Sequence, residues 1–176
     1  EALGVDPGAD PLVVIHVSAG NPFRRWPVAS FAALIARLAQ TDPRRRFVVI
    51  SGPSERDAAR EVGALARAER LDAGRVLDDV EFDLVELRAL VERAALFVGG
   101  DSGPLHVAGT SGVPIVGLYG PTLSARSAPW RSGRFVTESV EIEDLACRPC
   151  HQRRCEPGDF RCLGLVTPER VAEAAE

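Results

Sequence analysis

One stretch, from residue 95 to residue 122, constrains the fold of this chain most strongly. It begins with a short apolar run ending in Gly-Gly and closes with a second apolar run ending in Gly-Pro-Thr. Between the two runs, Asp101 or Ser102 can cap a helix that has Pro104 in its first turn, where the missing N–H is not needed. A glycine-rich turn at a helix N-terminus directs backbone N–H groups and the positive end of the helix dipole into one crevice. The stretch therefore predicts a strand, turn, helix and strand with a crevice suited to a phosphate or diphosphate.

The same alternation of strands and helices extends over the rest of the chain. Apolar runs predict strands at Leu12–Val17, Arg46–Ile50, Val76–Leu77, Ala95–Val98, Pro114–Gly120 and, at an edge, Phe135–Ile142. Helical periodicity predicts further helices from a cap near Ser30, at Glu55–Arg70, at Asp83–Arg93 and from a Thr167 cap. This order predicts an α/β fold, a Rossmann-like parallel sheet with helices on both faces. The loops that follow the strands, at Ser18, Gly52, Gly100 and Gly120, should share the ligand-binding rim.

Composition narrows the class of protein. The chain has 176 residues, of which 45% are hydrophobic and 26% charged, which suits one domain over residues 12–176 after a linker at 1–11. A net charge of −4 argues against a nucleic-acid partner. No apolar run approaches the roughly 20 residues of a membrane span, and the N-terminus lacks a signal-peptide pattern. All 21 basic residues are Arg and Met is absent, so we expect a processed chain or a piece of a longer protein.

Four segments together carry a resemblance to a known family. They are HVSAGNPFRRWP, SGPSE, GGDSGPLHVAGTSGVPIVGLYGPT and a late C-x2-C-x4-C-x6-C pattern. In this order they resemble the C-terminal half of the family 9 glycosyltransferases, the lipopolysaccharide heptosyltransferases and their relatives. The resemblance covers nearly the whole chain from Leu12. A single GDSG would be a weak signal, but four motifs in the right order are specific.

The resemblance implies the C-terminal half of a GT-B fold, the half that binds a nucleotide-sugar donor. It implies inverting transfer of a sugar, heptose from an ADP-heptose-like donor, to a lipid-linked glycan acceptor of the lipopolysaccharide type. The acceptor-binding half, with the family's catalytic carboxylate, lies outside this sequence, so we expect the chain to be inactive alone. The implied location is the cytoplasm, at the inner face of the inner membrane through the other half. No catalytic metal is implied, because protein dipoles and cations stabilise the leaving diphosphate.

Residue roles follow from the same resemblance. Asp101, Ser102, Gly103 and His106 match the D-[ST]-G-x-x-H element that meets the diphosphate and the sugar, and Arg24 matches a basic position, often Lys, that neutralises the leaving diphosphate. The implied catalytic residues are Arg24, Asp101 and His106. The implied donor-binding residues are Ser18, Gly52, Glu55, Phe82, Ser102, Gly103, Gly120 and Thr122. Among these, Ser18 donates to phosphate, Glu55 binds ribose hydroxyls and Phe82 packs on the base.

Several of these residues, and His16 beside them, also have a purely structural interpretation. His106 could pack on the sheet from its helix, and Asp101 and Ser102 could be caps alone. Glu55 could only favour a helix N-terminus. His16, inside a strand, is expected to be a core histidine. Arg24 could be one of a solvated pair of arginines.

The four cysteines, which are all that the chain has, fall within residues 147–162. The opening C-x2-C suits tetrahedral zinc, with His151 able to replace one thiolate, and an iron–sulfur cluster also takes four thiolates. Two disulfides or free thiols are the alternatives, although a reducing compartment disfavours disulfides. In every case the expected role is to pin a long loop. The candidate metal ligands are Cys147, Cys150, Cys155 and Cys162.

Two other classes of function stay open at this point. One is the donor half of another GT-B enzyme, such as a nucleotide-sugar 2-epimerase, which would release an epimer without an acceptor. The other is a non-enzymatic module that binds a nucleotide and a metal, which would bind unrelated nucleotides equally. Fold analogy alone does not separate them, because this architecture carries many activities.

Overall fold

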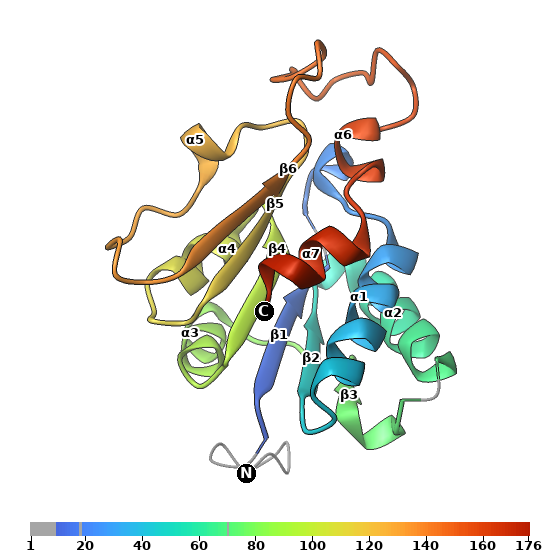
Figure 1. Cartoon of the computed structure of the whole chain (residues 1–176), viewed down its shortest axis with the longest axis vertical. Helices are drawn as coiled ribbons and strands as arrows, with labels where there is room; N and C mark the ends of the chain where they lie inside the picture. Colours follow the sequence, from blue (N-terminus) through green and yellow to red (C-terminus); the bar gives the residue numbers. More distant parts are fainter. Residues whose placement is uncertain (1–9, 18, 70) are drawn as a thin grey trace.

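A six-stranded sheet runs through the middle of the molecule (Figure 1). The computed structural model describes residues 10–17, 19–69 and 71–176. Every neighbouring pair of strands in the sheet is parallel, in the order β3-β2-β1-β4-β5-β6. The direction of the strand order therefore reverses between β1 and β4, which is where such sheets bind ligands. The strands are β1 Leu12–His16, β2 Arg46–Ile50, β3 Val76–Leu77, β4 Leu96–Gly100, β5 Ile115–Tyr119 and β6 Thr137–Glu141.

Helices cover both faces of the sheet, as predicted. Helices α1, α2 and α7 pack together on one face, and α3 and α4 pack together on the other (Figure 1). The α-helices are α1 Val28–Thr41, α2 Arg56–Ala68, α3 Leu84–Glu92, α4 Gly103–Gly109, α5 Ser124–Ser127, α6 Arg161–Gly164 and α7 Pro168–Ala174. Within the described residues, 3-10 turns precede α1, α2 and β3; these are η1 Pro22–Arg24, η2 Pro53–Glu55 and η3 Ala73–Arg75. None of the helices within the described residues is long and apolar enough to cross a membrane.

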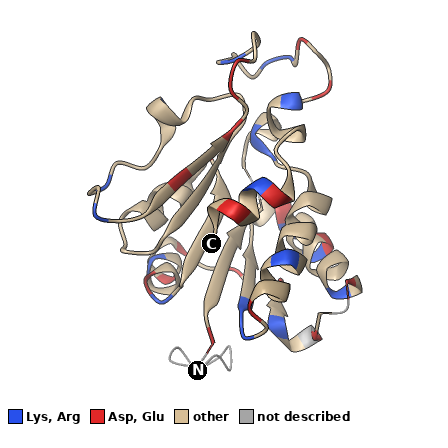
Figure 2. Ribbon diagram, in the orientation of Figure 1, with Lys and Arg blue, Asp and Glu red and all other residues tan. Residues whose placement is uncertain are grey.

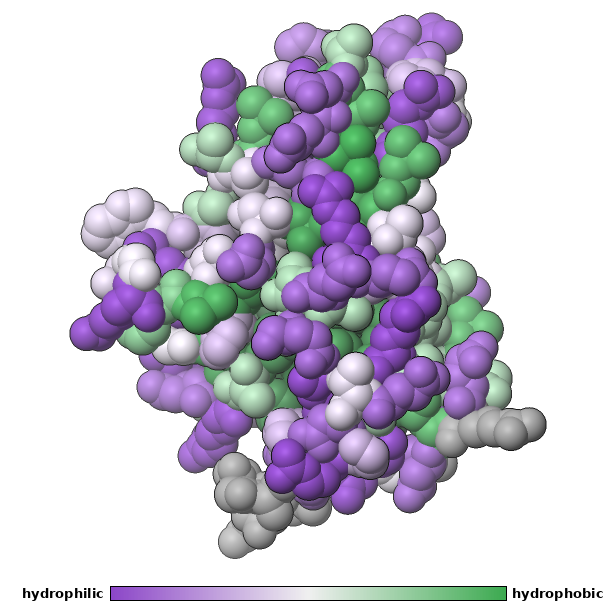
Figure 3. Space-filling view, in the orientation of Figure 1, coloured by the Kyte–Doolittle hydropathy of each residue, from purple (hydrophilic) through white to green (hydrophobic). Residues whose placement is uncertain are grey.

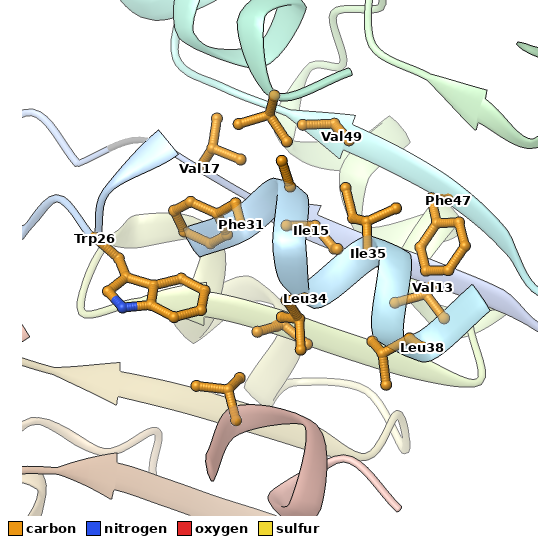
Figure 4. Packing of buried hydrophobic residues seen from close by; sticks show 14 of the residues in the cluster. Val13, Ile15, Val17, Trp26, Phe31, Leu34, Ile35, Leu38, Phe47 and Val49 are labelled. Atoms are coloured by element: carbon orange, nitrogen blue, oxygen red, sulfur yellow. The ribbon is translucent and has the colours of Figure 1, made fainter. Parts of the chain in front are cut away.

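The two faces of the sheet form two separate clusters of the core. Successive residues of a strand point to opposite faces, so Val13 and Ile15 belong to one cluster and Val14 to the other. The apolar stripe that the sequence predicted on α1, which includes Phe31 and Leu34, packs on the first of these clusters (Figure 4). The outer surface of that layer is mostly hydrophilic (Figure 3), and acidic and basic residues are interspersed along it (Figure 2).

Two helix starts differ in how well the sequence predicted them. Helix α3 begins with a full capping box, in which Asp83 and Glu86 bind each other's backbone N–H groups. The predicted cap near Ser30 is wrong, because α1 begins two residues earlier and Pro27 occupies the cap position. The backbone N–H of Ser30 donates to the Pro27 carbonyl instead. The backbone N–H of Phe31 donates to the same carbonyl, and Pro27 makes no side-chain cap hydrogen bond.

The predicted strand at 95–98 is longer in the structure, because β4 also contains Gly99 and Gly100. Gly99 pairs with His16 and with Gly117 on the two neighbouring strands. A Cβ atom on Gly100 would lie 3.1 Å from the carbonyl oxygen of Arg24. Glycine at position 100 therefore lets the loop after β1 approach the end of β4 closely.

Arg148 fixes the long segment that follows β6 to the sheet. Its side chain is only 5% exposed and pairs with Glu141 at 2.5 Å. The same guanidinium donates to the backbone carbonyls of Thr122, at 2.6 Å, and of Ile142. Because these partners lie just after β5 and at the end of β6, one arginine joins the segment to both strands.

We expect Arg148→Ala to lower the free energy of unfolding by about 3 kcal/mol, because the change leaves Glu141 and buried carbonyls without their partner. Urea denaturation of the chain measures this loss. Arg161→Ala is the matched control, because its pair with Asp159 is about half exposed and its loss should leave the free energy of unfolding nearly unchanged. Equal losses in the two variants would contradict the role given to Arg148.

Candidate functional site

A cleft of about 390 Å³ lies at the carboxyl ends of β1 and β2, beside the start of α4. The last residues of these strands, His16 and Ile50, form its floor. Residues from the loops after β1, β2 and β4 therefore meet at this edge of the sheet, as predicted, whereas the loop at Gly120 does not line the cleft. The predicted donor-binding residues that line the cleft are Gly52, Glu55, Phe82, Ser102 and Gly103.

The cleft is lined both by apolar side chains and by a carboxylate. Phe82 is half-buried, and its neighbour Leu84, at the first position of α3, is 69% exposed. Glu55, at the end of η2, lines the same cleft and forms an ion pair with Arg25. The Glu55 side chain is only 9% exposed, so this pairing fixes a mostly buried carboxylate at the cleft.

Next to the cleft, Asp101 lies close to three further residues that the sequence predicted, which are Arg24, Thr122 and His106. We call these four residues the Asp101 cluster. Arg24 Nη1 lies 3.2 Å from Asp101 Oδ2, and the Thr122 hydroxyl donates to the same oxygen at 2.7 Å. His106 Nε2, on the half-exposed face of α4, lies 4.0 Å from Asp101 Oδ1. The three predicted catalytic residues and Thr122 are therefore neighbours. One carboxylate oxygen of Asp101 therefore holds both the Arg24 guanidinium and the Thr122 hydroxyl.

Ser102 connects the cleft to the buried strand end. It occupies the N-cap position of α4, but its side chain makes no cap hydrogen bond, so the predicted side-chain cap is wrong. Its hydroxyl instead donates to the Gly100 carbonyl at 3.1 Å and lies 3.2 Å from His16 Nδ1. His16 is buried as expected, yet it also lines the cleft, which the sequence analysis missed. Its position at the end of a rim strand was the available signal.

Gly120 and Thr122, which were also predicted to bind the donor, do not line the cleft, and Thr122 belongs instead to the Asp101 cluster. Ser18 lies outside the described residues. Gly120 is buried, and a Cβ atom there would lie 2.5 Å from Leu163 Cγ. Glycine at position 120 is therefore explained by the close packing of α6 against the end of β5.

The four cysteines surround a second cavity, of about 350 Å³, in the segment after β6. All four are free thiols. Burial, and then the neighbouring thiols Cys150 and Cys147, raise the pKa of Cys162. Within the part of the chain that is described, no three His, Cys, Asp or Glu side chains stand close enough together to hold a metal ion. The metal centre stays a prediction, with a suitable set of donors around one cavity.

Gln152 was not among the predicted site residues, because no sequence motif marks it. Its side-chain oxygen accepts hydrogen bonds from Arg24 Nε at 2.7 Å and from Asn21 Nδ2 at 2.8 Å. The segment with the cysteines therefore contacts the Asp101 cluster directly.

His16 should make the stability of the fold depend on pH. Burial lowers its pKa from 6.5 to about 4, so between these values the unfolded chain binds a proton that the native chain excludes. We expect the free energy of unfolding to fall by about 3 kcal/mol from this group as the pH drops from 6.5 to 4. His16→Asn should remove that part of the slope, whereas His106→Asn, at a half-exposed histidine, should retain it. Unfolding curves measured across this pH range test the prediction, and an unchanged slope in His16→Asn would contradict it.

Comparison with known proteins adds to this geometry. Residues 2–158 match the model of glycosyltransferase family 9 (heptosyltransferase). Lipooligosaccharide heptosyltransferase 2 of Campylobacter jejuni is 27% identical over 99% of this chain and 50% of its own length. The chain thus spans about half the length of the relatives it matches.

Solved structures agree on the fold. E. coli ADP-heptose lipopolysaccharide heptosyltransferase II superposes with a TM-score of 0.76 at 23% identity, over 98% of this chain and 47% of that one. E. coli heptosyltransferase WaaC, solved with ADP, gives a TM-score of 0.69 at 18% identity, over 98% of this chain and 45% of that one. The sheet described above is therefore half of the fold of these enzymes. Together with the match over residues 2–158, this shows that the chain belongs to glycosyltransferase family 9, the heptosyltransferase family.

Proposed function

We propose that this chain is the donor-binding domain of a heptosyltransferase, and that its 390 Å³ cleft holds the nucleoside diphosphate of an ADP-heptose-like donor. The observation that carries this proposal is the set of groups that meet at the rim. Apolar side chains, a paired carboxylate and a serine–glycine turn line one cleft, and Arg24 lies beside that turn, paired with Asp101; these are the groups that a base, a ribose and a diphosphate require. Membership of family 9 supports the reaction class, and ADP in the WaaC structure supports an adenine nucleotide.

The base and the ribose would occupy the part of the cleft between η2 and α3. Phe82 and the exposed Leu84 offer an apolar surface on which a base can pack. The Glu55 carboxylate is an acceptor for ribose hydroxyl groups, and its ion pair with Arg25 holds it in place. The volume lies within the range of small-molecule sites, which is roughly 300–1,000 Å³.

The diphosphate would lie across the turn at the start of α4. A Cβ atom on Gly103 would meet nothing within 4 Å, so the backbone there is open to a ligand. The Ser102 hydroxyl lies in the same part of the cleft, and the guanidinium of Arg24 is 3.2 Å from the adjacent Asp101. Since α4 has only seven residues, the proposal relies on Arg24 and these polar groups more than on the helix dipole.

The reaction we propose is inverting transfer to a lipid-linked glycan acceptor on the cytoplasmic side of the membrane. A base outside this chain takes the proton of an acceptor hydroxyl, whose oxygen forms a bond to the anomeric carbon. The bond from that carbon to the diphosphate oxygen breaks with its electron pair, and Arg24 stabilises the charge on the leaving group. Asp101 holds Arg24 and Thr122, and His106 faces the region where the sugar would lie. These steps require no catalytic metal.

The first test is nucleotide binding by the protein at its natural length. ADP at about 100 times its dissociation constant should add roughly 2.7 kcal/mol to the free energy of unfolding. Arg24→Ala should weaken ADP binding by about tenfold to a hundredfold through loss of charge-assisted hydrogen bonds, and should leave adenosine binding unchanged. Isothermal titration calorimetry measures both.

Arg37→Ala is the matched control for that test, because Arg37 is exposed on α1 and pairs with Glu169. It should bind ADP as the unmodified protein does. Stabilisation by UDP, GDP or CMP in preference to ADP would contradict the proposed donor, and ADP binding by Arg24→Ala at unchanged affinity would contradict the proposed role of this arginine.

We further propose that the cysteine cavity takes a structural zinc ion, which would draw the thiolates closer together and pin residues 147–162. We expect about one equivalent of zinc per chain when the protein is purified without chelator. Removal by a chelator should lower the melting temperature, and Cys150→Ser should lose the metal. Metal-free protein with four titratable thiols would contradict this proposal, and iron in place of zinc would correct its metal.

A further inference from the structure

The side chain of Gln152 connects the cysteine segment to Arg24 of the proposed diphosphate site. Gln152 lies between Cys150 and Cys155, and its Oε1 atom accepts from Arg24 Nε at 2.7 Å and from Asn21 Nδ2 at 2.8 Å. Both neighbours are donors, so the amide must present its oxygen to them. One oxygen atom therefore joins the segment after β6 to the loop after β1.

This contact completes the set of bonds that orients the Arg24 guanidinium. Nε is held by Gln152, whereas Nη1 faces the Asp101 carboxylate at 3.2 Å and the Asp101 carbonyl at 3.3 Å. A guanidinium is planar with its donors in a fixed fork, so partners at two different positions define its plane. With Asp101 alone, the group could still turn about its contact with that residue. The bond to Gln152 removes this freedom.

The segment that carries Gln152 is itself held in place close by. Arg148 joins it to β5 and β6, and the backbone N–H of Cys150 donates to the Pro121 carbonyl at 3.1 Å. The ring of Phe160 packs edge-on against Phe23, the residue before Arg24, with centroids 5.4 Å apart. Gln152 therefore extends from an anchored segment.

We propose that Gln152 is a positioning residue, which orients the guanidinium of Arg24 toward the diphosphate of the donor; this inference rests on the proposed function. A neutral acceptor suits the task. Asp101 already provides one carboxylate, and a second one at position 152 would compensate the charge that Arg24 offers to the diphosphate. An amide oxygen fixes the guanidinium without this loss.

The test compares Gln152→Ala with Gln152→Glu in the protein at its natural length, using ADP and adenosine as probes. Gln152→Ala should raise the dissociation constant of ADP about fivefold to tenfold, the size expected for one lost hydrogen bond, and leave that of adenosine unchanged. Gln152→Glu retains an acceptor, so its melting temperature should equal that of the unmodified protein, yet its ADP affinity should fall at least as far. Gln40→Ala, the same truncation at an exposed position of α1, should change neither quantity.

The outcomes separate the inference from the proposed function. If the unmodified protein binds no ADP, the proposed function fails and this inference fails with it. If ADP binds and Arg24→Ala abolishes binding while Gln152→Ala does not weaken it, the inference alone is overturned. The inference is also overturned if Gln152→Glu binds ADP normally while Gln152→Ala loses affinity for ADP and adenosine alike, because a purely structural contact would give that result.

Discussion

The buried carboxylate of Asp101 is the interaction on which the rim of this domain depends. Its side chain is only 7% exposed, and a charge so far from water is tolerated only when it is paired and hydrogen-bonded. Its partners Arg24 and Thr122 come from the loops after β1 and β5, while Asp101 itself follows β4. One desolvated charge thus holds together three loops from neighbouring strands. The geometry of the proposed site and the stability of the rim are two consequences of the same contacts.

Small residues at the strand ends make these contacts possible. Gly100 leaves the space in which the Arg24 backbone approaches β4, and Gly120 leaves the space for Leu163. Larger side chains at either position would move the loops apart before any polar contact formed. The parallel sheet therefore provides the rim, and the glycines determine how closely its loops pack.

The sequence predicted the sheet and the cleft because both depend on local patterns. Residues 46–50 and 76–77 have the bounds predicted for them, since a buried strand is a run of apolar residues ended by turn residues. Glu55 and Phe82 could be placed at one cleft because parallel strands bring their carboxyl ends to the same edge. Gln152 could not be predicted, because its importance comes from Arg24, which is distant in the sequence. Gly120 was predicted to bind the donor because its packing partner, Leu163, lies in a later helix and could not be recognised from the sequence near Gly120.

The use of arginine at position 24 follows from the way the residue is held. The chain contains no lysine, so its composition alone accounts for a cation of this type. The site nevertheless depends on a property that arginine has and lysine lacks. A guanidinium has five N–H donors in a fixed plane, whereas an ammonium is a point charge on a flexible stem. Arg24 gives Nε to Gln152 and Nη1 to Asp101, and still has donors on Nη2 that neither of these partners engages. A lysine held by the same two acceptors would have one donor left and no defined plane, so the arrangement at Gln152 and Asp101 is specific to arginine.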